Sequence, residues 1–312
     1  MEGSRNFNMN IIETHNLTRR FGRNEAVHDL TLAVPEGSVC ALLGSNGAGK
    51  STTIKVLMNL LIPTSGSARV LGVDSRKLGE KERTQIGYVS ENQQLPLWMT
   101  VRQLLDYCRP FYPTWDRALE KTLLAQFALP EDRKLKHLSR GMLMKAALLS
   151  SLAYRPKLLV LDEPFSGLDP LVRDEFIKGV LEVSATGGWT VLVSSHDIEE
   201  VERLCDRVAL LDGGRLQIDE TTEALQARFR RVEVNLQDGE AKLDALPKSW
   251  LGVERAGGLV RFVESRFDSQ MTERACREHF PEGALTAQPM TLREIFIARA
   301  RAGRTEAKGA AA

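Results

Sequence analysis

A glycine-rich stretch, Gly44–Thr52, directly follows the apolar run Val39–Leu43. Glycines let a backbone turn tightly around an anion, and the N–H groups of such a loop and of the helix after it point at phosphate. Lys50 would neutralise the outer phosphates of a nucleotide, and Ser51 would supply a hydroxyl for Mg²⁺. Apolar residues then recur at helical spacing, as this mechanism requires. The pattern predicts a phosphate-binding site made of Gly44, Ser45, Asn46, Gly47, Ala48, Gly49, Lys50, Ser51 and Thr52.

Two adjacent acids follow a second apolar run about a hundred residues later. Leu158–Leu161 has the pattern of a short buried strand, and Asp162 and Glu163 stand at its carboxyl end. One carboxylate can hold the metal, while the other can orient or deprotonate the water that attacks the outer phosphate. A solvated turn or a helix start would explain an isolated Asp-Glu pair, but together with the phosphate loop the pair predicts a hydrolase.

Four further motifs resemble the ATP-binding subunit of ABC transporters. Leu138–Met142 is similar to the signature sequence Leu-Ser-Gly-Gly-Gln, and Ser166–Asp169 resembles the D-loop. His196 follows the expected strand Val191–Ser195 and matches the switch histidine, while Phe21 matches the aromatic residue that stacks on adenine. The order and spacing of the motifs fit the family over roughly residues 11 to 218.

The resemblance implies a role for each of these residues and a second copy of the chain as partner. Ser139 and Gly141 would face the γ-phosphate held by the other copy, so that two head-to-tail subunits enclose two ATP molecules. His196 would contact the γ-phosphate and Phe21 the adenine. Each position also has an ordinary structural explanation: Ser139 as a helix N-cap, His196 as a buried histidine and Phe21 as a packing residue.

Two positions depart from the family pattern. Glu91 stands where a glutamine is usual, and its oxygen would still reach Mg²⁺ or its waters. Arg140 and Met142 replace a glycine and a glutamine of the signature. Arg140 brings a cation to the phosphate-facing helix start, where it would either help to hold ATP or pair with an acid of the partner copy.

The alternation of apolar strands and helical patterns predicts an α/β fold with a mostly parallel sheet covered by helices. The phosphate loop and the family resemblance imply that this fold is of the P-loop NTPase type, with a RecA-like core and an antiparallel β edge. Residues 11–218 would form the ATPase domain, with a helical subdomain at about 92–156 in which Thr114 caps a helix. Residues 219–301 would form a small accessory α/β domain that closes with a helix capped by Thr291 and Glu294. Residues 302–312 are expected to be disordered.

Composition limits the class of protein further. Lysine and arginine total 42 against 41 aspartate and glutamate, a formal net charge of +1, so nucleic-acid binding is not expected. The four cysteines have no metal-ligand or paired spacing, and no run is apolar enough to span a membrane. The resemblance is closest to ABC-2 type exporters and implies a peripheral subunit on the cytoplasmic face of the inner (plasma) membrane, with separate transmembrane permease subunits as partners. A soluble ABC ATPase acting on DNA or ribosomes and a nucleotide-gated regulatory module are the alternatives.

Overall fold

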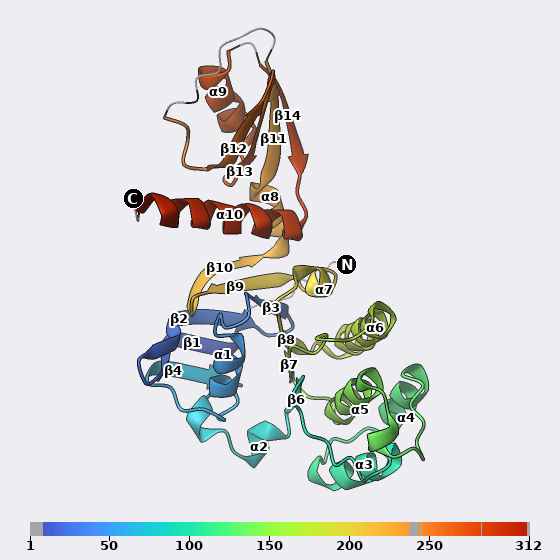
Figure 1. Cartoon of the computed structure of the whole chain (residues 1–312). Coiled ribbons are helices and arrows are strands. Elements are labelled where there is room, and N and C mark those ends of the chain that lie inside the picture. Colours follow the sequence, from blue (N-terminus) through green and yellow to red (C-terminus); the bar gives the residue numbers. More distant parts are fainter. Residues whose placement is uncertain (1–8, 237–242, 244, 282, 311–312) are drawn as a thin grey trace. The chain divides into compact units, whose positions relative to one another are not determined.

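The computed structural model describes residues 9–236, 243, 245–281 and 283–310. The chain divides into two compact units, Met1–Asp219 and Glu220–Ala312, which are described separately below (Figure 1). The division lies one residue after the boundary expected from the sequence.

A six-stranded sheet forms the centre of the first unit. Its order is β10-β9-β3-β8-β7-β6, and the pairs β9–β3, β3–β8, β8–β7 and β7–β6 are parallel. Every residue of β3, β7 and β8 is buried, which is typical of parallel strands covered on both faces. Parallel pairing places the carboxyl ends of these strands at one edge of the sheet. The strands are β3 (Val39–Leu43), β6 (Ile86–Ser90), β7 (Leu158–Asp162), β8 (Thr190–Ser195), β9 (Arg207–Asp212) and β10 (Arg215–Thr221).

A second, antiparallel sheet of order β2-β1-β4-β5 lies on the other side of helix α1 (Lys50–Leu57). One apolar cluster joins both sheets through α1, with Leu30 from β2, Ile54 and Leu57 from the helix, and Leu42 and Val160 from the parallel sheet. The helix that begins at the phosphate loop is therefore fixed from both sides. The strands are β1 (Asn10–Phe21), β2 (Asn24–Pro35), β4 (Ser65–Val70) and β5 (Val73–Asp74), followed by a short 3-10 turn (Ser75–Lys77) and α2 (Glu80–Arg83).

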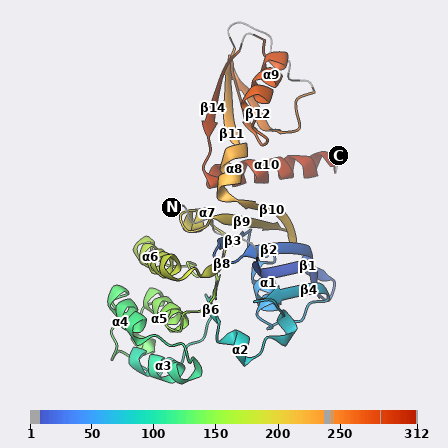
Figure 2. The same ribbon diagram turned by 180° about the vertical axis from the view of Figure 1, so that it is seen from behind.

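A group of helices lies beside the β6 edge of the parallel sheet (Figures 1 and 2). Helix α3 begins with a reciprocal cap between Thr100 and Gln103. Asp116, and not Thr114, caps α4, because the Thr114 hydroxyl donates instead to the Tyr154 carbonyl at 2.6 Å. The helices are α3 (Val101–Cys108), α4 (Arg117–Gln126), α5 (Arg140–Leu152) and α6 (Pro170–Gly187), with 3-10 turns at Arg109–Phe111 and Leu135–His137. The short helix α7 (Ile198–Val201) lies apart from this group, in contact with β8. The predicted P-loop NTPase fold with a helical subdomain is confirmed.

The second unit is an antiparallel sheet of order β12-β13-β11-β14 with three helices. Its core contains Trp250 stacked on Phe262, with Phe280 and Cys276 from the helical side. Thr291 and Glu294 form the expected capping box of α10. This helix extends through Ala310, so residues 302–310 are helical and not disordered as expected, in line with the helix-favouring Ala, Arg, Glu and Lys of that segment. The elements are α8 (Thr222–Arg228), β11 (Arg230–Asn235), β12 (Trp250–Ala256), β13 (Leu259–Glu264), α9 (Ser269–His279), β14 (Ala284–Pro289) and α10 (Leu292–Ala310).

Candidate functional site

The phosphate loop joins the buried end of β3 to the start of α1. Its conformation requires glycine at two positions at least: Gly44 has φ 154° and Gly49 has φ 102°. A Cβ at either residue would lie 2.4 Å from a backbone carbonyl oxygen, that of Leu211 or of Ala26. The loop is thus a tight backbone turn packed against β9 and β2, and Ser45, Asn46 and Gly47 at its tip are exposed.

Lys50 is the first residue of α1, and its side chain is only 4% exposed. Its ammonium donates to the carbonyl oxygens of Gly44 and Ser45 at 2.7 and 3.2 Å, and it lies 3.0 Å from Glu163 Oε1. The charge is therefore held between the phosphate loop and the carboxylate predicted to be the base.

Asp162 ends β7 and is buried. Its Oδ1 accepts hydrogen bonds from the hydroxyls of Ser51 at 2.9 Å and Ser194 at 2.8 Å. The first residues of α1 and the ends of the neighbouring strands β7 and β8 thus meet at one carboxylate oxygen, and the predicted metal residues Ser51 and Asp162 are brought together.

Glu163 is the first residue after β7, and its backbone is in the left-handed region with φ 50°. Its N–H donates to the Ser194 hydroxyl at 3.0 Å, which fixes this turn. Its Oε2 accepts a hydrogen bond from His196 Nδ1 at 2.8 Å, while its Oε1 faces Lys50. Burial raises the pKa of Glu163, but the hydrogen bonds and charges of His196 and Lys50 outweigh burial, so the net pKa lies below its usual value. The carboxylate is ionised at neutral pH, as a base must be.

The side chains around Asp162 fit a magnesium ion that shares its ligands with a nucleotide. Mg²⁺ takes oxygen ligands and is commonly held by one or two carboxylates together with substrate phosphates. Asp162 and Ser51 supply a carboxylate and a hydroxyl oxygen in contact with each other. Among the described residues, no group of three or more His, Cys, Asp or Glu side chains could hold a metal.

The signature residues stand at the beginning of α5. The Ser139 hydroxyl accepts a hydrogen bond from the Met142 N–H at 3.2 Å, so Ser139 is the N-cap of this 13-residue helix and is exposed. Gly141 is buried, and a Cβ there would lie 2.7 Å from Val172 Cγ1 of α6. The helix start is thus packed against α6 while its cap faces solvent.

Glu91 follows β6, and its carboxylate points to the signature and the D-loop. Glu91 Oε1 accepts from Arg140 Nη2 at 2.6 Å and from the Ser166 hydroxyl at 2.9 Å, while the Glu91 N–H donates to the Asp162 carbonyl at 3.0 Å. Only its backbone is thus bonded to Asp162, and direct metal binding by Glu91 stays a prediction. Arg140 pairs with an acid of its own chain, which differs from both alternatives considered from the sequence.

Phe21 ends β1 and is 45% exposed. The Arg19 guanidinium lies 4.5 Å from the centre of the ring and covers one face. The exposed ring is compatible with stacking on a base, which stays a prediction.

Sequence reasoning missed Ser194, the hydroxyl that holds both acidic residues. Its signal was present as a hydroxyl that directly follows the apolar residues Val191–Val193 in a fully buried strand. A hydroxyl in such a strand needs a partner, and the acids at the end of the adjacent strand are the nearest polar groups.

Comparison with known proteins agrees with this geometry. The ABC transporter family model matches residues 27–166. The ATP-binding protein DrrA of Streptomyces peucetius, named for daunorubicin/doxorubicin resistance, is 32% identical over 92% of this chain and 91% of its own length. The ABC transporter ATP-binding protein YtrB of Bacillus subtilis (strain 168) is 27% identical over 93% of this chain and 98% of its own length.

A solved structure of an ATP-binding subunit of an ABC transporter superposes with a TM-score of 0.63, at 30% identity over 70% of this chain and 92% of that one. The part of the chain that the structure describes contains no helix with the length and apolar character needed to cross a membrane. The chain belongs to the ATP-binding subunits of ABC transporters, which are ATPases coupled to transport.

Proposed function

We propose that the chain is the motor subunit of an ABC exporter, in which two copies close around two Mg-ATP and drive separate membrane subunits. The observation that carries the proposal is the convergence on Asp162 and Glu163. Lys50, Ser51, Ser194 and His196 all lie within 3.0 Å of one of these two carboxylates. A binding module that does not hydrolyse has no need for the second acid.

Each residue has a defined task in hydrolysis. The loop N–H groups and Lys50 bind the phosphates, and the Ser51 and Asp162 oxygens hold the metal, which neutralises charge on the phosphates. Glu163 accepts the proton of the attacking water, and its low pKa keeps it ready to do so. His196 donates to Glu163 through Nδ1, which orients the ring so that Nε2 faces away from Glu163 and can contact the γ-phosphate.

The exposed start of α5 supports the pairing of two copies. The N-terminus of a helix attracts anions through its N–H groups and its dipole. Ser139 caps this terminus at the surface, so a phosphate there would come from another molecule. We assign that phosphate to ATP bound by a second copy.

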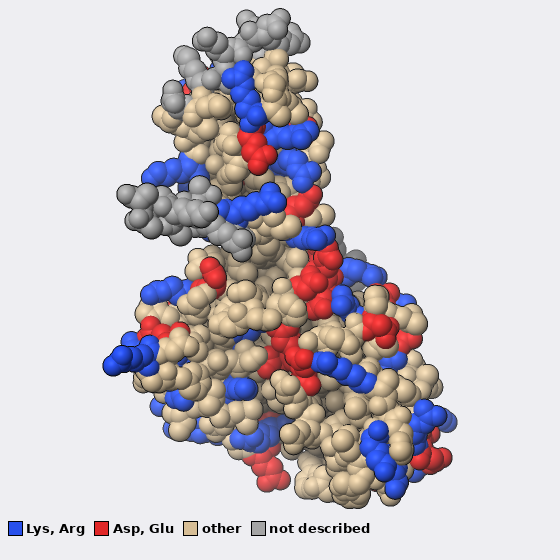
Figure 3. Space-filling model, viewed as in Figure 1, with Lys and Arg blue, Asp and Glu red and all other residues tan. Residues whose placement is uncertain are grey.

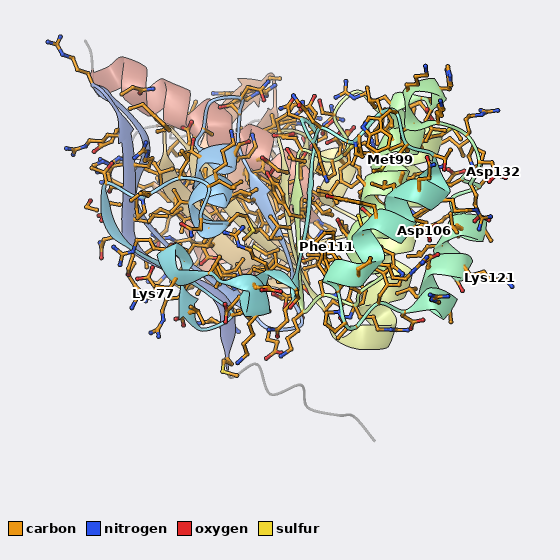
Figure 4. The ribbon with its side chains drawn as sticks, turned by 90° about the horizontal axis from the view of Figure 1, so that it is seen from below. Lys77, Met99, Asp106, Phe111, Lys121 and Asp132 are labelled. Atoms are coloured by element: carbon orange, nitrogen blue, oxygen red, sulfur yellow. The ribbon has the colours of Figure 1, made fainter. Side chains whose placement is uncertain are left out.

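The membrane partner would contact the face seen in Figure 4. Two adjoining hollows of about 320 and 560 Å³, which share Arg83 and Tyr112, lie between the α2 region and the residues that follow α3. Phe111, labelled in Figure 4, lines the larger hollow and is 60% exposed, and Trp98 is 67% exposed. The exposed Phe111 ring in this groove fits a short helix of a membrane subunit, and the exposure of Trp98 makes it a further candidate contact.

Export is the favoured direction because DrrA carries a resistance name and the closing segment Met290–Phe296 resembles ABC-2 exporter subunits. The alternative function, a soluble ABC ATPase that acts on DNA or ribosomes, has less support. Figure 3 shows Lys and Arg interspersed with Asp and Glu over the visible face of the first unit, whereas a nucleic-acid surface gathers basic residues.

The test is the identity of the protein that copurifies with the tagged chain from detergent-solubilised membranes. We expect a protein with many membrane spans, and we expect Trp98→Ala to lower its recovery. Met271→Ala is the matched control, since Met271 is 74% exposed on the second unit. Recovery of ribosomes or DNA-repair proteins in place of a membrane protein would overturn the proposal.

A further inference from the structure

Three segments next to the nucleotide site meet at one carboxylate oxygen. Glu91 follows β6, Arg140 opens α5, and Ser166 lies in the loop after β7. Arg140 Nη2 and the Ser166 hydroxyl both donate to Glu91 Oε1, at 2.6 and 2.9 Å. We call these three residues the Glu91 clamp.

The clamp is packed as well as hydrogen-bonded. Gly167 has φ 67°, and a Cβ there would lie 2.7 Å from Arg140 Nη1, so the guanidinium lies directly against the D-loop turn. The Glu91 N–H is bonded to the Asp162 carbonyl, so the clamp is tied to the residue that ends β7. A shift of the α5 start would therefore be transmitted to the D-loop turn and to the backbone at Asp162.

The ion pair between residues 91 and 140 depends on both departures from the family pattern. The glycine usual at position 140 has no side chain to reach residue 91, and the glutamine usual at position 91 has no charge to hold a guanidinium. The Arg140 and Glu91 side chains are 51% and 29% exposed, so water and salt weaken the pair. The clamp is thus a weak, reversible link between the signature helix and the hydrolytic core.

We propose that Arg140 is a positioning residue that acts through Glu91. Through Glu91, Arg140 fixes the start of α5 and the D-loop turn relative to Asp162. Two copies close on ATP from this conformation. The inference rests on the proposed function, because it concerns the closure step. It places no contact between Arg140 and ATP, so binding of nucleotide to one chain does not depend on Arg140.

The test compares Arg140→Gln, Glu91→Gln and the double variant in a Glu163→Gln background, where ATP is not consumed. Glutamine at position 91 keeps an oxygen for the metal but loses the charge, which separates the clamp from any metal role. Sedimentation velocity gives the ATP concentration at half-dimerisation. We expect each single variant to raise this ATP concentration about two- to fivefold, which is the range for the loss of a partly exposed ion pair. The double variant should raise the ATP concentration no further than either single variant does.

Three controls make the result specific. Arg203→Gln removes another exposed ion pair of the same unit, to Asp174 at 3.1 Å, and should leave closure unchanged. Arg140→Lys should need less ATP to dimerise than Arg140→Gln does, since lysine keeps the positive charge but lacks the planar guanidinium. Added salt should raise the ATP requirement of the parent more than that of Arg140→Gln, because only the parent has the ion pair to screen.

Additive effects of the two single changes would overturn the proposal, because Arg140 would then act independently of Glu91. Weaker binding of a fluorescent ATP analogue to monomeric Arg140→Gln would also overturn it, since the residue would belong to the nucleotide pocket. If the parent dimerises and the variants need the same ATP concentration, this inference alone fails. If the parent never dimerises with ATP, the proposed function fails and this inference falls with it.

Discussion

The backbone conformation of Glu163 is strained for any residue with a Cβ, and the free energy of this strain can be measured. Its φ of 50° is in the left-handed region, which costs a residue with a Cβ about 1–2 kcal/mol. Glu163→Ala and Glu163→Gly both remove the carboxylate and its contacts with His196 and Lys50. The two variants differ from each other only in the Cβ, so their difference in unfolding free energy contains the backbone strain and the entropy of glycine in the unfolded chain, but no contribution from the lost carboxylate.

We expect Glu163→Gly to be more stable than Glu163→Ala by about 0.5–1 kcal/mol. Relief of strain raises the unfolding free energy of the glycine variant by about 1–2 kcal/mol relative to alanine. The greater entropy of glycine in the unfolded chain lowers it by about 0.4–1 kcal/mol. Urea unfolding followed by far-UV circular dichroism measures the difference. Lys121, exposed in the middle of α4 (Figure 4), supplies the matched control, where alanine should exceed glycine by about 1 kcal/mol. An alanine variant at least as stable as the glycine variant at position 163 would refute the strained turn.

Three further predictions concern the same site and the second unit. Ser194→Ala should lower the unfolding free energy by about 1–3 kcal/mol, because the Glu163 N–H loses its partner, and it should lower kcat; an unchanged urea midpoint would contradict this. Because the pKa of Glu163 lies below its usual value, kcat/KM should show no acid limb from this base between pH 6 and 8; an acid limb near pH 6 that follows Glu163 would contradict this. The stability that the ionised carboxylate contributes should be present at neutral pH and lost only as the pH falls below the usual pKa of a glutamate. A chain ending at Asp219 should still bind ATP, because all the residues placed at the nucleotide site precede Asp219, but it should need more ATP to dimerise, as measured by sedimentation velocity; an equal ATP requirement of the full and shortened chains would show that the second unit is not a dimerisation element.

The parts of the fold that the sequence predicted well are those with local, strongly patterned signals. The phosphate loop has a glycine spacing imposed by its backbone, and Asp162 follows a continuous apolar strand. The pairing of parallel strands at one edge then brings His196 to Glu163, although they are 33 residues apart. The loop and the acids follow from local pattern, whereas His196 was identified by its resemblance to the switch histidine and by its place at a strand end.

Contacts between distant surface side chains were not predictable in this way. Arg140 and Glu91 are 49 residues apart, and nothing in either segment specifies the rotamers that bring them together. Thr114 and Asp116 are both good caps, and the choice between them depends on the position of the Tyr154 carbonyl. The left-handed turn at Glu163 carries no glycine that would have indicated it, because this position holds the carboxylate proposed as the base.

In the proposed function, two copies enclose ATP between the phosphate loop of one and the signature helix of the other, with Glu163 as base. Sedimentation velocity and ATP turnover of Glu163→Gln, with and without Mg-ATP, test this arrangement. We expect turnover to fall about 10²- to 10⁴-fold, ATP to bind still, and a stable dimer to accumulate with ATP. Adding Ser139→Ala should raise the ATP needed for this dimer without changing ATP binding to the monomer. Turnover near the parent rate would show that Glu163 is not the base, and a monomer at saturating ATP would show that two copies do not enclose ATP.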